Sequence, residues 1–320
     1  MHRIGVLTSG GDAPGMNAAI RAVVRKGIFH GYEVLGVRRG FAGLIDGDIQ
    51  PLNAGSVADV IQAGGTILLT ARSEEFLTAE GRMQAHASVR RAGIDGLVII
   101  GGDGSLKGAF TFYRETEIPV LCVPATIDND ISGTDFTIGF DTAVNNVVDA
   151  INKIRDTATS HERTFVVEVM GRHSGFIALA AGLAGGAESI LIPESPFDLE
   201  AVCRRLLRGV RRGKLHSVII VAEGAGSAAE VAREIKARTG FDTKITVLGH
   251  IQRGGAPTAY DRILASIMGA RAIDLLEAGE RSAMVGLTGS RLKHYDLARV
   301  FEVKKQIDKE LYRLAEVLAI

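Results

Sequence analysis

Residues 96–105 read Gly-Leu-Val-Ile-Ile-Gly-Gly-Asp-Gly-Ser. The apolar, β-branched run up to Ile100 predicts a buried strand, and the glycines after it predict a tight turn into a helix that begins near Ser105. The N-terminus has the same order, because an apolar run from Arg3 leads into Thr-Ser-Gly-Gly-Asp-Ala-Pro-Gly at 8–15 and then into an apolar helical pattern. There Asp12 is expected to cap the helix and Pro14 to start it. Strands that alternate with helices in this way predict parallel sheets covered by helices on both faces.

The same alternation continues along the whole chain. Apolar runs predict strands at 3–8, 33–37, 96–100, 120–123, 164–169, 189–192, 218–222 and 245–248. Helical patterns lie between or after them, at 15–29, 82–92, 104–114, 141–159, 173–184, 198–212, 226–239, 258–278 and 304–318. Because the strands fall into two groups of four, we expect an α/β protein with two Rossmann-like three-layer α/β/α domains and mostly parallel sheets.

The composition excludes several classes of protein. The chain has 320 residues, of which 46% are hydrophobic and 39 are glycine, typical of a globular protein with a large core. With 37 basic and 37 acidic residues and 5% aromatic residues, nucleic acid is not expected as a partner. The longest nearly apolar run, Phe176–Ala187, is shorter than the roughly 20 residues of a membrane span, so no membrane association is expected. Cys122 and Cys203 have no paired spacing, which favours reduced thiols and a cytoplasmic location.

Two glycine-rich turns at strand ends are candidate phosphate sites. Gly10 and Gly11 could turn bare backbone N–H groups toward a phosphate, although a strand-to-helix turn without a ligand explains them as well. In the turn at 101–105, the acidic Asp103 would repel phosphate unless a cation bridges them, so Asp103 is a candidate magnesium ligand. The alternative is that Asp103 caps the following helix.

The segment Thr126-Ile127-Asp128-Asn129-Asp130 follows another predicted strand. If it is extended, Asp128 and Asp130 present two carboxylates to one space with Thr126 in line. Paired carboxylates suit a reaction that deprotonates a hydroxyl and holds a metal-bound polyphosphate. A solvated turn rich in Asp and Asn is the alternative.

Several arginines lie beside turns at strand ends. Arg72 follows a strand-like segment at 66–70, Arg163 precedes the strand at 164, and Arg172 and Arg253 lie next to glycines. Any one of them could be a solvated or ion-pairing residue, but together they favour a pocket for small phosphate esters.

Taken in order, these segments resemble the motifs of bacterial ATP-dependent 6-phosphofructokinases. The matching stretches are SGGDAPGMNAAIR at 9–21, IGGDGS at 100–105, TIDNDI at 126–131, DTATSHER at 156–163, VMGRHSG at 169–175 and VLGHIQRGG at 247–255. The resemblance runs from residue 3 to about 320. It implies a cytoplasmic homotetramer that phosphorylates fructose 6-phosphate at its 1-hydroxyl with MgATP, the committed step of glycolysis. It also implies a larger ATP-binding domain (1–139 and 252–302) and a smaller fructose-6-phosphate domain (140–251 and 303–320).

The resemblance assigns roles to individual residues. The ATP site would contain Gly11, Arg72, Ser73, Gly102, Asp103, Gly104 and Ser105, with Asp103 on magnesium. Asp128 would be the general base, and the other catalytic residues would be Arg172, Arg72, Asp130, Thr126 and Gly11. Fructose 6-phosphate would be bound by Thr126, Ile127, Asp128, Arg163, Met170, Gly171, Arg172, Glu223, Lys244, His250, Ile251, Gln252 and Arg253, with Arg163 and Lys244 supplied across a subunit boundary.

The resemblance also implies a regulatory site between subunits, with ADP as activator and phosphoenolpyruvate as inhibitor. Its residues would be Arg21, Ala22, Val23, Val24, Arg25, Arg155, Gly186, Ala187, Glu188, Arg212, Lys214, Leu215 and His216. Ala54 stands where some members have an effector-contacting arginine. The acid-free basic cluster from Arg204 to Lys214 overlaps this set, and its other explanation is a solvated helix face.

Three positions differ from the common pattern or separate the family from its relatives. Lys244 replaces the usual arginine, which keeps the charge but loses the bidentate fork. Ala125 replaces a common glycine. Pyrophosphate-using relatives tend to have aspartate at the position of Gly104 and lysine at that of Ala125, so ATP is favoured here. The alternatives are a pyrophosphate-dependent enzyme and a non-catalytic sensor on the same fold. A dinucleotide-dependent oxidoreductase lacks its fingerprint, because Lys107 stands where the last glycine belongs.

Overall fold

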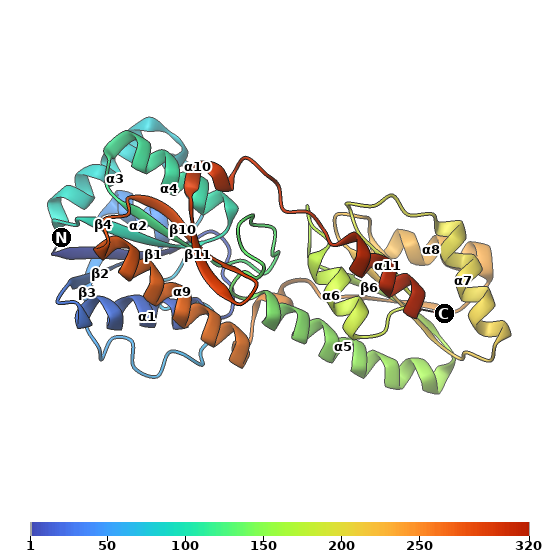
Figure 1. Ribbon diagram of the computed structural model, residues 1–320. Coiled ribbons are helices and arrows are strands. Elements are labelled where there is room, and N and C mark those ends of the chain that lie inside the picture. The colour runs from blue at the N-terminus through green and yellow to red at the C-terminus, as the bar shows by residue number, and fades with distance from the viewer. Residues whose placement is uncertain (1, 320) are drawn as a thin grey trace. The chain divides into compact units, whose positions relative to one another are not determined.

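The computed structural model describes residues 2–319, which form two compact units (Figure 1). Unit 1 comprises the chain up to Ile127, together with Ile131–Thr142 and Arg253–Lys305. Unit 2 comprises Asp128–Asp130, Ala143–Gln252 and the chain from Gln306. The chain therefore passes between the units several times.

Unit 1 is built on a seven-stranded sheet with the order β11-β10-β5-β4-β1-β2-β3. The five central strands are parallel, and the edge strands β3 and β11 are antiparallel to their neighbours. The strands are β1 (Arg3–Ser9), β2 (Glu33–Val37), β3 (Ile49–Leu52), β4 (Gly96–Gly101), β5 (Val120–Pro124), β10 (Ser282–Thr288) and β11 (Arg291–Asp296).

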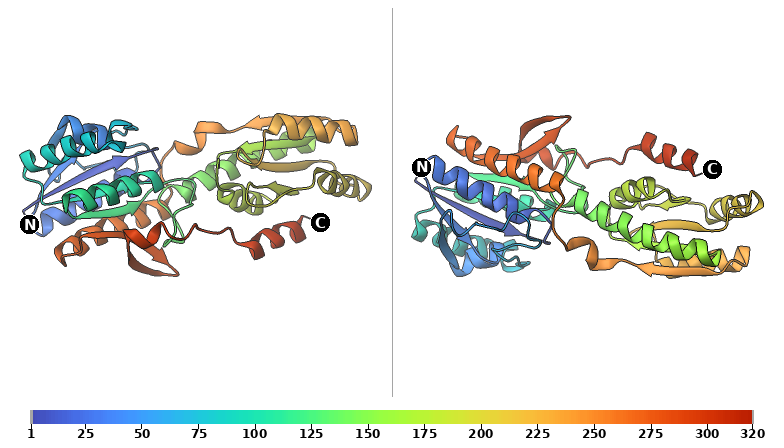
Figure 2. Two further views of the ribbon diagram at one scale, coloured as in Figure 1. Left: turned by 90° about the horizontal axis from the view of Figure 1, so that it is seen from above. Right: turned by 90° about the horizontal axis from the view of Figure 1, so that it is seen from below.

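Helices cover both faces of this sheet because its central strands are apolar on both sides. Helices α1 and α9 lie side by side on one face (Figure 2). Helices α2, α3 and α4 cover the other, where Leu106 and Phe112 of α4 pack on Leu97 and Ile99 of β4. The helices of unit 1 are α1 (Met16–Phe29), α2 (Gly40–Asp46), α3 (Ala79–Ala92), α4 (Asp103–Thr116), α9 (Ala259–Glu277) and α10 (Leu297–Val300), with a 3₁₀ turn η1 (Glu75–Leu77).

Unit 2 has a four-stranded parallel sheet with the order β7-β8-β6-β9. Helices α7 and α8 pack on one face, on a core that includes Val166 and Ile219, whereas α6 packs on the opposite face against Ile190. The strands are β6 (Thr164–Val169), β7 (Ser189–Leu191), β8 (Ser217–Ala222) and β9 (Thr243–Val247). The helices are α5 (Phe140–His161, beginning in unit 1), α6 (Phe176–Ala184), α7 (Leu199–Arg211), α8 (Ala228–Thr239), η2 (Gly249–Arg253) and α11 (Lys309–Leu318).

The predicted α/β class and the division of the eight strands into two mostly parallel sheets are confirmed. Strands β3, β10 and β11 and helices α2 and α10 were not predicted from the sequence. Strands β3 and β11 lie at the sheet edge, and their exposed positions are polar or proline, so they lack an apolar run. Among residues 2–319, no helix combines the length and the apolar character that crossing a membrane requires.

Several local predictions are wrong. Thr66–Thr70 is not a strand; it forms turns, and Thr8 Oγ1 donates to the Leu69 carbonyl oxygen at 2.8 Å. The N-cap of α1 is Gly15, whose φ of 107° only glycine adopts readily, and not Asp12. Helix α3 begins at 79 because Thr78 caps it, three residues before the predicted start.

Candidate active site

Three loops of unit 1 meet at the carboxyl edge of its sheet. Strand pairing places Ser9 of β1 opposite Gly101 of β4, and Gly101 opposite Pro124 of β5. The residues that follow these strands are therefore neighbours. The structure thus brings together the glycine turn at 10–11, the turn at 102–105 and Thr126, which is where parallel α/β sheets bind ligands.

The glycine turn at 101–105 is tightly packed at Gly101 and open at Gly104. A Cβ at Gly101 would lie 2.6 Å from the Ser9 carbonyl oxygen, so this close approach of two strand ends requires glycine. Ser105 is only 5% exposed and lies beneath Gly10. By contrast, a Cβ at Gly104 would meet no atom within 4 Å. The first N–H groups of α4, which precede its intrahelical hydrogen bonds, thus lie at a turn with open space beside Gly104, which suits an anion.

Asp103 is the first residue of α4, and Gly102 is the N-cap, so Asp103 is not the capping residue. Its side chain is 46% exposed, and one carboxylate oxygen lies 2.6 Å from Lys107 Nζ. An exposed carboxylate beside an anion cradle fits Mg²⁺, which takes one or two carboxylates and fills its other positions with water and phosphate oxygens. Among residues 2–319, the one cluster of three potential metal ligands is His30, Asp274 and Glu277, which does not include Asp103.

Arg72 and Ser73 follow the turns at 66–70. Thr70 Oγ1 donates to the Gly10 carbonyl oxygen at 2.8 Å, which attaches this segment to the first glycine turn. Ser73 Oγ accepts a hydrogen bond of 3.2 Å from the Phe76 N–H. The Arg72 side chain is exposed, and no carboxylate within residues 2–319 forms an ion pair with it. Its charge is therefore available to a phosphate.

Arg253 lies against the first glycine turn. Its Nη1 donates to the Asp12 carbonyl oxygen at 3.2 Å, and a Cβ at Gly11 would lie 2.5 Å from the same nitrogen. Any side chain at Gly11 would therefore displace this guanidinium.

The segment Asp128–Asp130 belongs to unit 2 and is not extended throughout. Asn129 has a φ of 51°, in the left-handed region, so the extended geometry expected from the sequence is wrong. Even so, Thr126, Asp128 and Asp130 are half-buried, whereas Ile127 and Asn129 between them are buried. Side chains at alternate positions thus retain access to solvent. The Ile127 side chain is fully buried, so a contact of this residue with substrate would have to come from its backbone.

The carboxyl edge of the unit 2 sheet carries a second group of predicted residues. Val169 pairs with Ala222, which makes Met170 and Glu223 neighbours, and the Leu248 N–H donates to the Glu168 carbonyl oxygen at 3.1 Å. Gly171 has a φ of 130°, and a Cβ there would lie 2.2 Å from the Ser174 carbonyl oxygen. The exposed side chains at this edge are Arg172, Glu223, His250 and Ile251.

Gln252 differs from its neighbours because its side chain is fully buried. Its Oε1 accepts a hydrogen bond of 3.2 Å from the Met170 N–H, and its Nε2 donates to the Gly249 carbonyl oxygen at 3.0 Å. The side-chain amide thus connects the loop after β6 with the turn after β9. A role in positioning these loops fits this geometry, and direct contact with substrate does not.

Arg163 and Lys244 lie at the opposite edge of the same sheet. Arg163 directly precedes β6, and Lys244 is the second residue of β9. Both pair with Asp242, whose carboxylate lies 2.9 Å from Arg163 Nε and 3.0 Å from Lys244 Nζ. These two cations, Lys244 above all, hold the pKa of Asp242 below its usual range. A six-residue strand spans about 20 Å, so Met170 and Arg163 of one chain lie too far apart to hold one small phosphate ester.

Comparisons with known proteins identify the family of the chain. The profile of the family described as Phosphofructokinase matches residues 3–276. The chain belongs to the phosphofructokinase family. It is 58% identical over 332 residues to the ATP-dependent 6-phosphofructokinase of Halothermothrix orenii and 59% identical over 320 residues to that of Halalkalibacterium halodurans, with 100% of each chain covered. The solved phosphofructokinase of Saccharomyces cerevisiae superposes with a TM-score of 0.89 at 37% identity, covering 99% of this chain and 46% of the yeast chain.

In this phosphofructokinase, the part of the predicted regulatory set that falls in unit 2 forms one cluster. Arg155 Nη2 donates to the carbonyl oxygens of Gly185 and, at 3.2 Å, Gly186. The ammonium group of Lys214 pairs with the buried Glu188. Burial lowers the pKa of His216, whose Nδ1 lies 3.2 Å from Thr159 Oγ1.

The unit 1 part of that set lies on α1. Arg25 is exposed and Arg21 partly exposed, but Val23 and Val24 are completely buried and face the core. Only the two arginines can therefore present charged side chains to a ligand.

Sequence reasoning missed Asp242 and the positioning role of Gln252. The pairing of Asp242 with Lys244 is local, but its pairing with Arg163 joins segments 79 residues apart, which no local pattern indicates. Gln252 lies between His250 and Arg253 in the sequence, and this position led to the prediction of a ligand contact. Nothing in the local sequence indicated its internal hydrogen bonds.

Proposed function

We propose that this chain transfers the γ-phosphoryl group of ATP to the 1-hydroxyl of fructose 6-phosphate, giving fructose 1,6-bisphosphate and ADP. The observation that carries this proposal is identity of 58–59% over the full length to enzymes named ATP-dependent 6-phosphofructokinase. The geometry of both units supports it, because phosphoryl transfer depends mainly on positioning and charge neutralisation.

Unit 1 is proposed as the ATP-binding domain. The backbone N–H groups at Gly102–Gly104 would bind phosphate oxygens, and Arg72 would neutralise the transferring group. Asp103 would hold the magnesium ion, which when bound supplies positive charge to the β- and γ-phosphates. Lys107 must then give up its contact with Asp103.

Unit 2 is proposed as the sugar-phosphate domain. Asp128 would accept the proton of the 1-hydroxyl group. The hydroxyl oxygen then forms a bond to the γ-phosphorus, while the bond from that phosphorus to the β-phosphate oxygen breaks. Asp130 of unit 2 and Thr126 of unit 1 would orient the attacking oxygen, and Arg172 would stabilise negative charge on the transferring group. Met170, Gly171 and Glu223 would hold the sugar and His250 the 6-phosphate, to which Arg253, a residue of unit 1, is also assigned.

The open space at Gly104 supports ATP as the phosphoryl donor. The absence of any atom within 4 Å of a Cβ at this position leaves room for an α-phosphate and nucleoside, whereas an aspartate there would oppose them by bulk and charge. Ala125 is fully buried and uncharged, so it does not provide the positive charge of the lysine that pyrophosphate-using relatives tend to have at this position. Both residues favour ATP over pyrophosphate.

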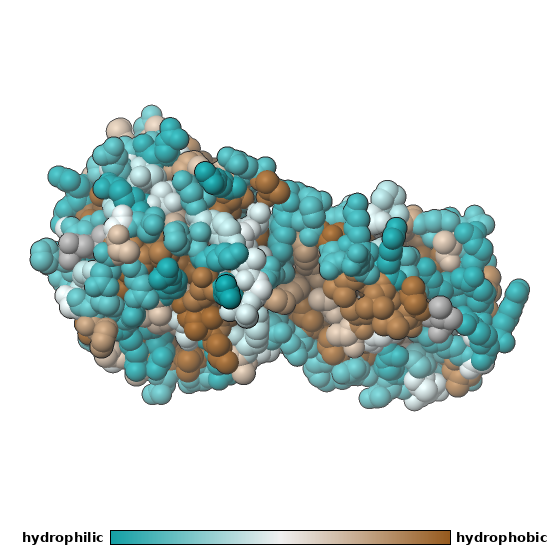
Figure 3. Space-filling view, in the orientation of Figure 1, coloured by the Kyte–Doolittle hydropathy of each residue, from teal (hydrophilic) through white to brown (hydrophobic). Residues whose placement is uncertain are grey.

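A homotetramer with shared sites is proposed because Arg163 and Lys244 lie at the amino edge of the unit 2 sheet. The same copy cannot supply them to a phosphate bound at the carboxyl edge, so a second copy would do so. Apolar side chains gather on the surface over α9 and α11 (Figure 3), where Ile263 is 62% and Val317 59% exposed. Exposed apolar surface of this kind is typical of subunit contacts.

The regulatory cluster is proposed to bind ADP as activator and phosphoenolpyruvate as inhibitor. Arg155 and Lys214 offer cationic groups to such anions. Because the site is expected to lie between subunits, Arg21 and Arg25 would join it from another copy of the chain. Two buried cysteines agree with the proposed cytoplasmic location.

The deciding experiment is an assay of the purified protein with fructose 6-phosphate and either MgATP or magnesium pyrophosphate, beside Asp128→Asn. Turnover with MgATP and a loss of about 10²–10⁴-fold in kcat for Asp128→Asn are expected. Failure to turn over with either donor would contradict the kinase assignment, and a preference for pyrophosphate would contradict the donor. Asp149→Asn, an exposed change on α5, is the matched control.

A further inference from the structure

The helix α7 and its C-cap carry four arginines that line one cavity. Arg205, Arg208, Arg211 and Arg212 border a cavity of about 570 Å³, together with Glu316 and Ala319 at the end of α11. All six residues belong to unit 2. Smaller cavities of about 270 Å³ and 150 Å³ adjoin it and share Arg205 in their walls.

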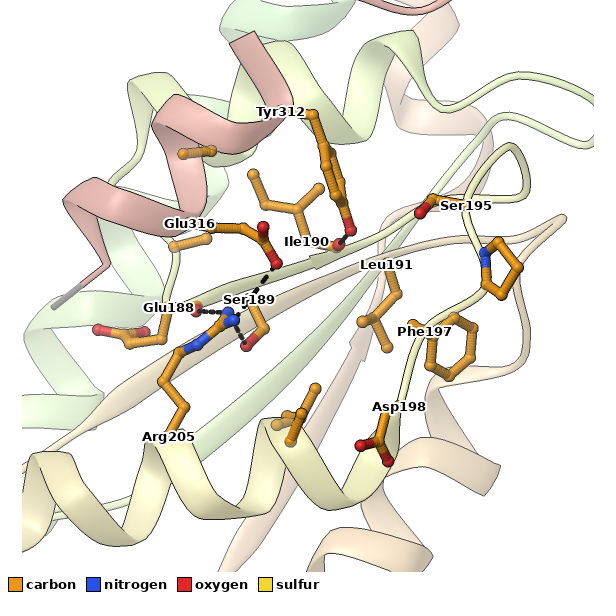
Figure 4. A pocket seen from close by; sticks show the side chains of 15 residues that line it. Glu188, Ser189, Ile190, Leu191, Ser195, Phe197, Asp198, Arg205, Tyr312 and Glu316 are labelled. Carbon is orange, nitrogen blue, oxygen red and sulfur yellow. Dashed lines mark hydrogen bonds and ion pairs between the residues drawn. The ribbon is translucent and has the colours of Figure 1, made fainter. Parts of the chain in front are cut away.

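Arg205 is the fixed member of this group (Figure 4). Its side chain is 22% exposed, and Nη1 donates to the Glu188 carbonyl oxygen at 2.9 Å and to Ser189 Oγ at 3.1 Å. Its Nη2 lies 3.4 Å from a carboxylate oxygen of Glu316, which is half exposed. Such a long, solvated ion pair stabilises little and can be exchanged for another anion.

The other three arginines of the cavity lack a carboxylate. Within residues 2–319, no acidic side chain forms an ion pair with Arg208, Arg211 or Arg212. The neighbouring basic residues differ, because Arg204 pairs with Asp198 and Glu200, and Lys214 pairs with Glu188. Among the described residues that line the cavity, four guanidinium groups therefore face a single half-exposed carboxylate, that of Glu316.

We propose that this cavity binds a chain of two or more phosphate groups. Guanidinium groups match phosphate oxygens in bidentate geometry, and several of them on neighbouring turns can hold successive phosphates. An isolated phosphate would engage only part of the set. The source of the phosphate chain is either inorganic polyphosphate or the tail of a nucleotide.

This cavity is separate from the proposed active site and adjoins the regulatory cluster, because the 150 Å³ cavity that shares Arg205 and Arg212 with it is also lined by Glu188 and Lys214. None of the residues assigned to ATP or fructose 6-phosphate borders the cavity, and Arg212 is the one residue it shares with the regulatory set. The proposal therefore stands independently of the kinase activity and goes beyond it.

Isothermal titration calorimetry with inorganic tripolyphosphate, in magnesium-free buffer at fixed ionic strength, tests the proposal. We expect Arg208→Gln/Arg211→Gln to raise the Kd of one tripolyphosphate site at least about tenfold, because two charge-assisted contacts are lost. Arg204→Gln is the matched control on the same helix and should leave that Kd unchanged. Kinase activity at saturating substrates, measured on the same samples, shows that the variants are folded.

Two further titrations locate the site and its source. If Lys214→Gln abolishes tripolyphosphate binding and the double arginine variant does not, the anion occupies the regulatory cluster and the proposal is overturned. Unchanged affinity in the double variant overturns it as well. A titration with ATP then separates the sources, because a nucleotide ligand loses one binding site in the double variant, and an inorganic one leaves the ATP stoichiometry unchanged.

Discussion

The side-chain oxygen of Gln252 accepts a hydrogen bond of 3.2 Å from the backbone N–H of Met170, which joins the turn after β9 to the loop after β6. Both segments are proposed to bind fructose 6-phosphate. The edge of unit 2 that is proposed to bind substrate thus depends on a side chain that is fully buried.

Replacement of Gln252 by methionine tests this connection. Methionine has a similar volume but lacks strong hydrogen-bonding groups, so the Met170 N–H and the Gly249 carbonyl lose their partners. We expect KM for fructose 6-phosphate to rise about tenfold, with a smaller change in KM for ATP. Steady-state kinetics measure both constants. Gln50→Met, on the exposed edge strand β3, is the control, and an equal rise in both KM values would contradict a positioning role.

The Lys244→Arg variant tests the departure from the usual arginine. A guanidinium group can bind phosphate in bidentate fashion, so we expect a severalfold lower KM for fructose 6-phosphate at similar kcat. Lys236→Arg, exposed on α8, should leave KM unchanged. If KM for fructose 6-phosphate does not fall in Lys244→Arg, the proposed contact with the sugar phosphate is wrong.

Asp103→Asn tests the magnesium assignment. The amide retains one oxygen but loses the charge that attracts the cation, so the Mg²⁺ concentration for half-maximal activity should increase about tenfold. A magnesium titration at fixed ATP measures it. Lys107→Gln, which removes the competing ammonium from the same carboxylate, should shift the titration in the opposite direction or leave it unchanged. A Mg²⁺ requirement that is the same in Asp103→Asn and wild type would argue against the assignment.

Asp261→Asn should destabilise unit 1. The buried carboxylate of Asp261 accepts hydrogen bonds from the N–H of Gly139 at 2.9 Å, and from the N–H and hydroxyl of Thr142 at 2.8 and 2.5 Å. Burial raises its pKa, but these three donors favour the charged form. An amide presents donors of its own to them, so we expect a loss of about 2–4 kcal/mol, seen as a lower Tm in calorimetry. The exposed Asp149→Asn should change Tm little, and an unchanged Tm in Asp261→Asn would refute the prediction.

His216 predicts a pH dependence of stability. Because burial lowers its pKa in the folded chain, the unfolded chain binds a proton first as the pH falls below about 6.5. The contribution of His216 to stability should therefore decline as the pH falls from about 6.5 to the lower pKa of the folded state. Above about pH 6.5 this contribution should remain constant. Melting curves from pH 5 to 8 should show a shallower decline for His216→Gln than for wild type. His2→Gln, exposed near the N-terminus, is the control, and parallel curves for all three proteins would exclude this role.

The sequence alone was sufficient to predict the class of fold and most of the elements around the site. Runs such as Gly96–Ile100 are apolar on both faces and end in glycine, so their local pattern defines both a buried strand and a phosphate-binding turn. The edge strands β3 and β11 carry no such pattern. They form because a neighbouring strand offers hydrogen bonds, which is information that lies elsewhere in the chain.

Which side chains remain available for chemistry was decided only by the tertiary structure. Gln252 and Ile127 lie within motifs that suggest ligand contacts, but the packing of the folded chain buries both side chains. Arg163 and Met170 are seven positions apart in the sequence and lie at opposite ends of β6. Sequence fixes the order of residues and their local backbone preference, whereas burial, hydrogen-bond partners and the direction of each strand end depend on contacts between distant segments. For this reason the residue types of the site could be predicted, but their individual roles could not.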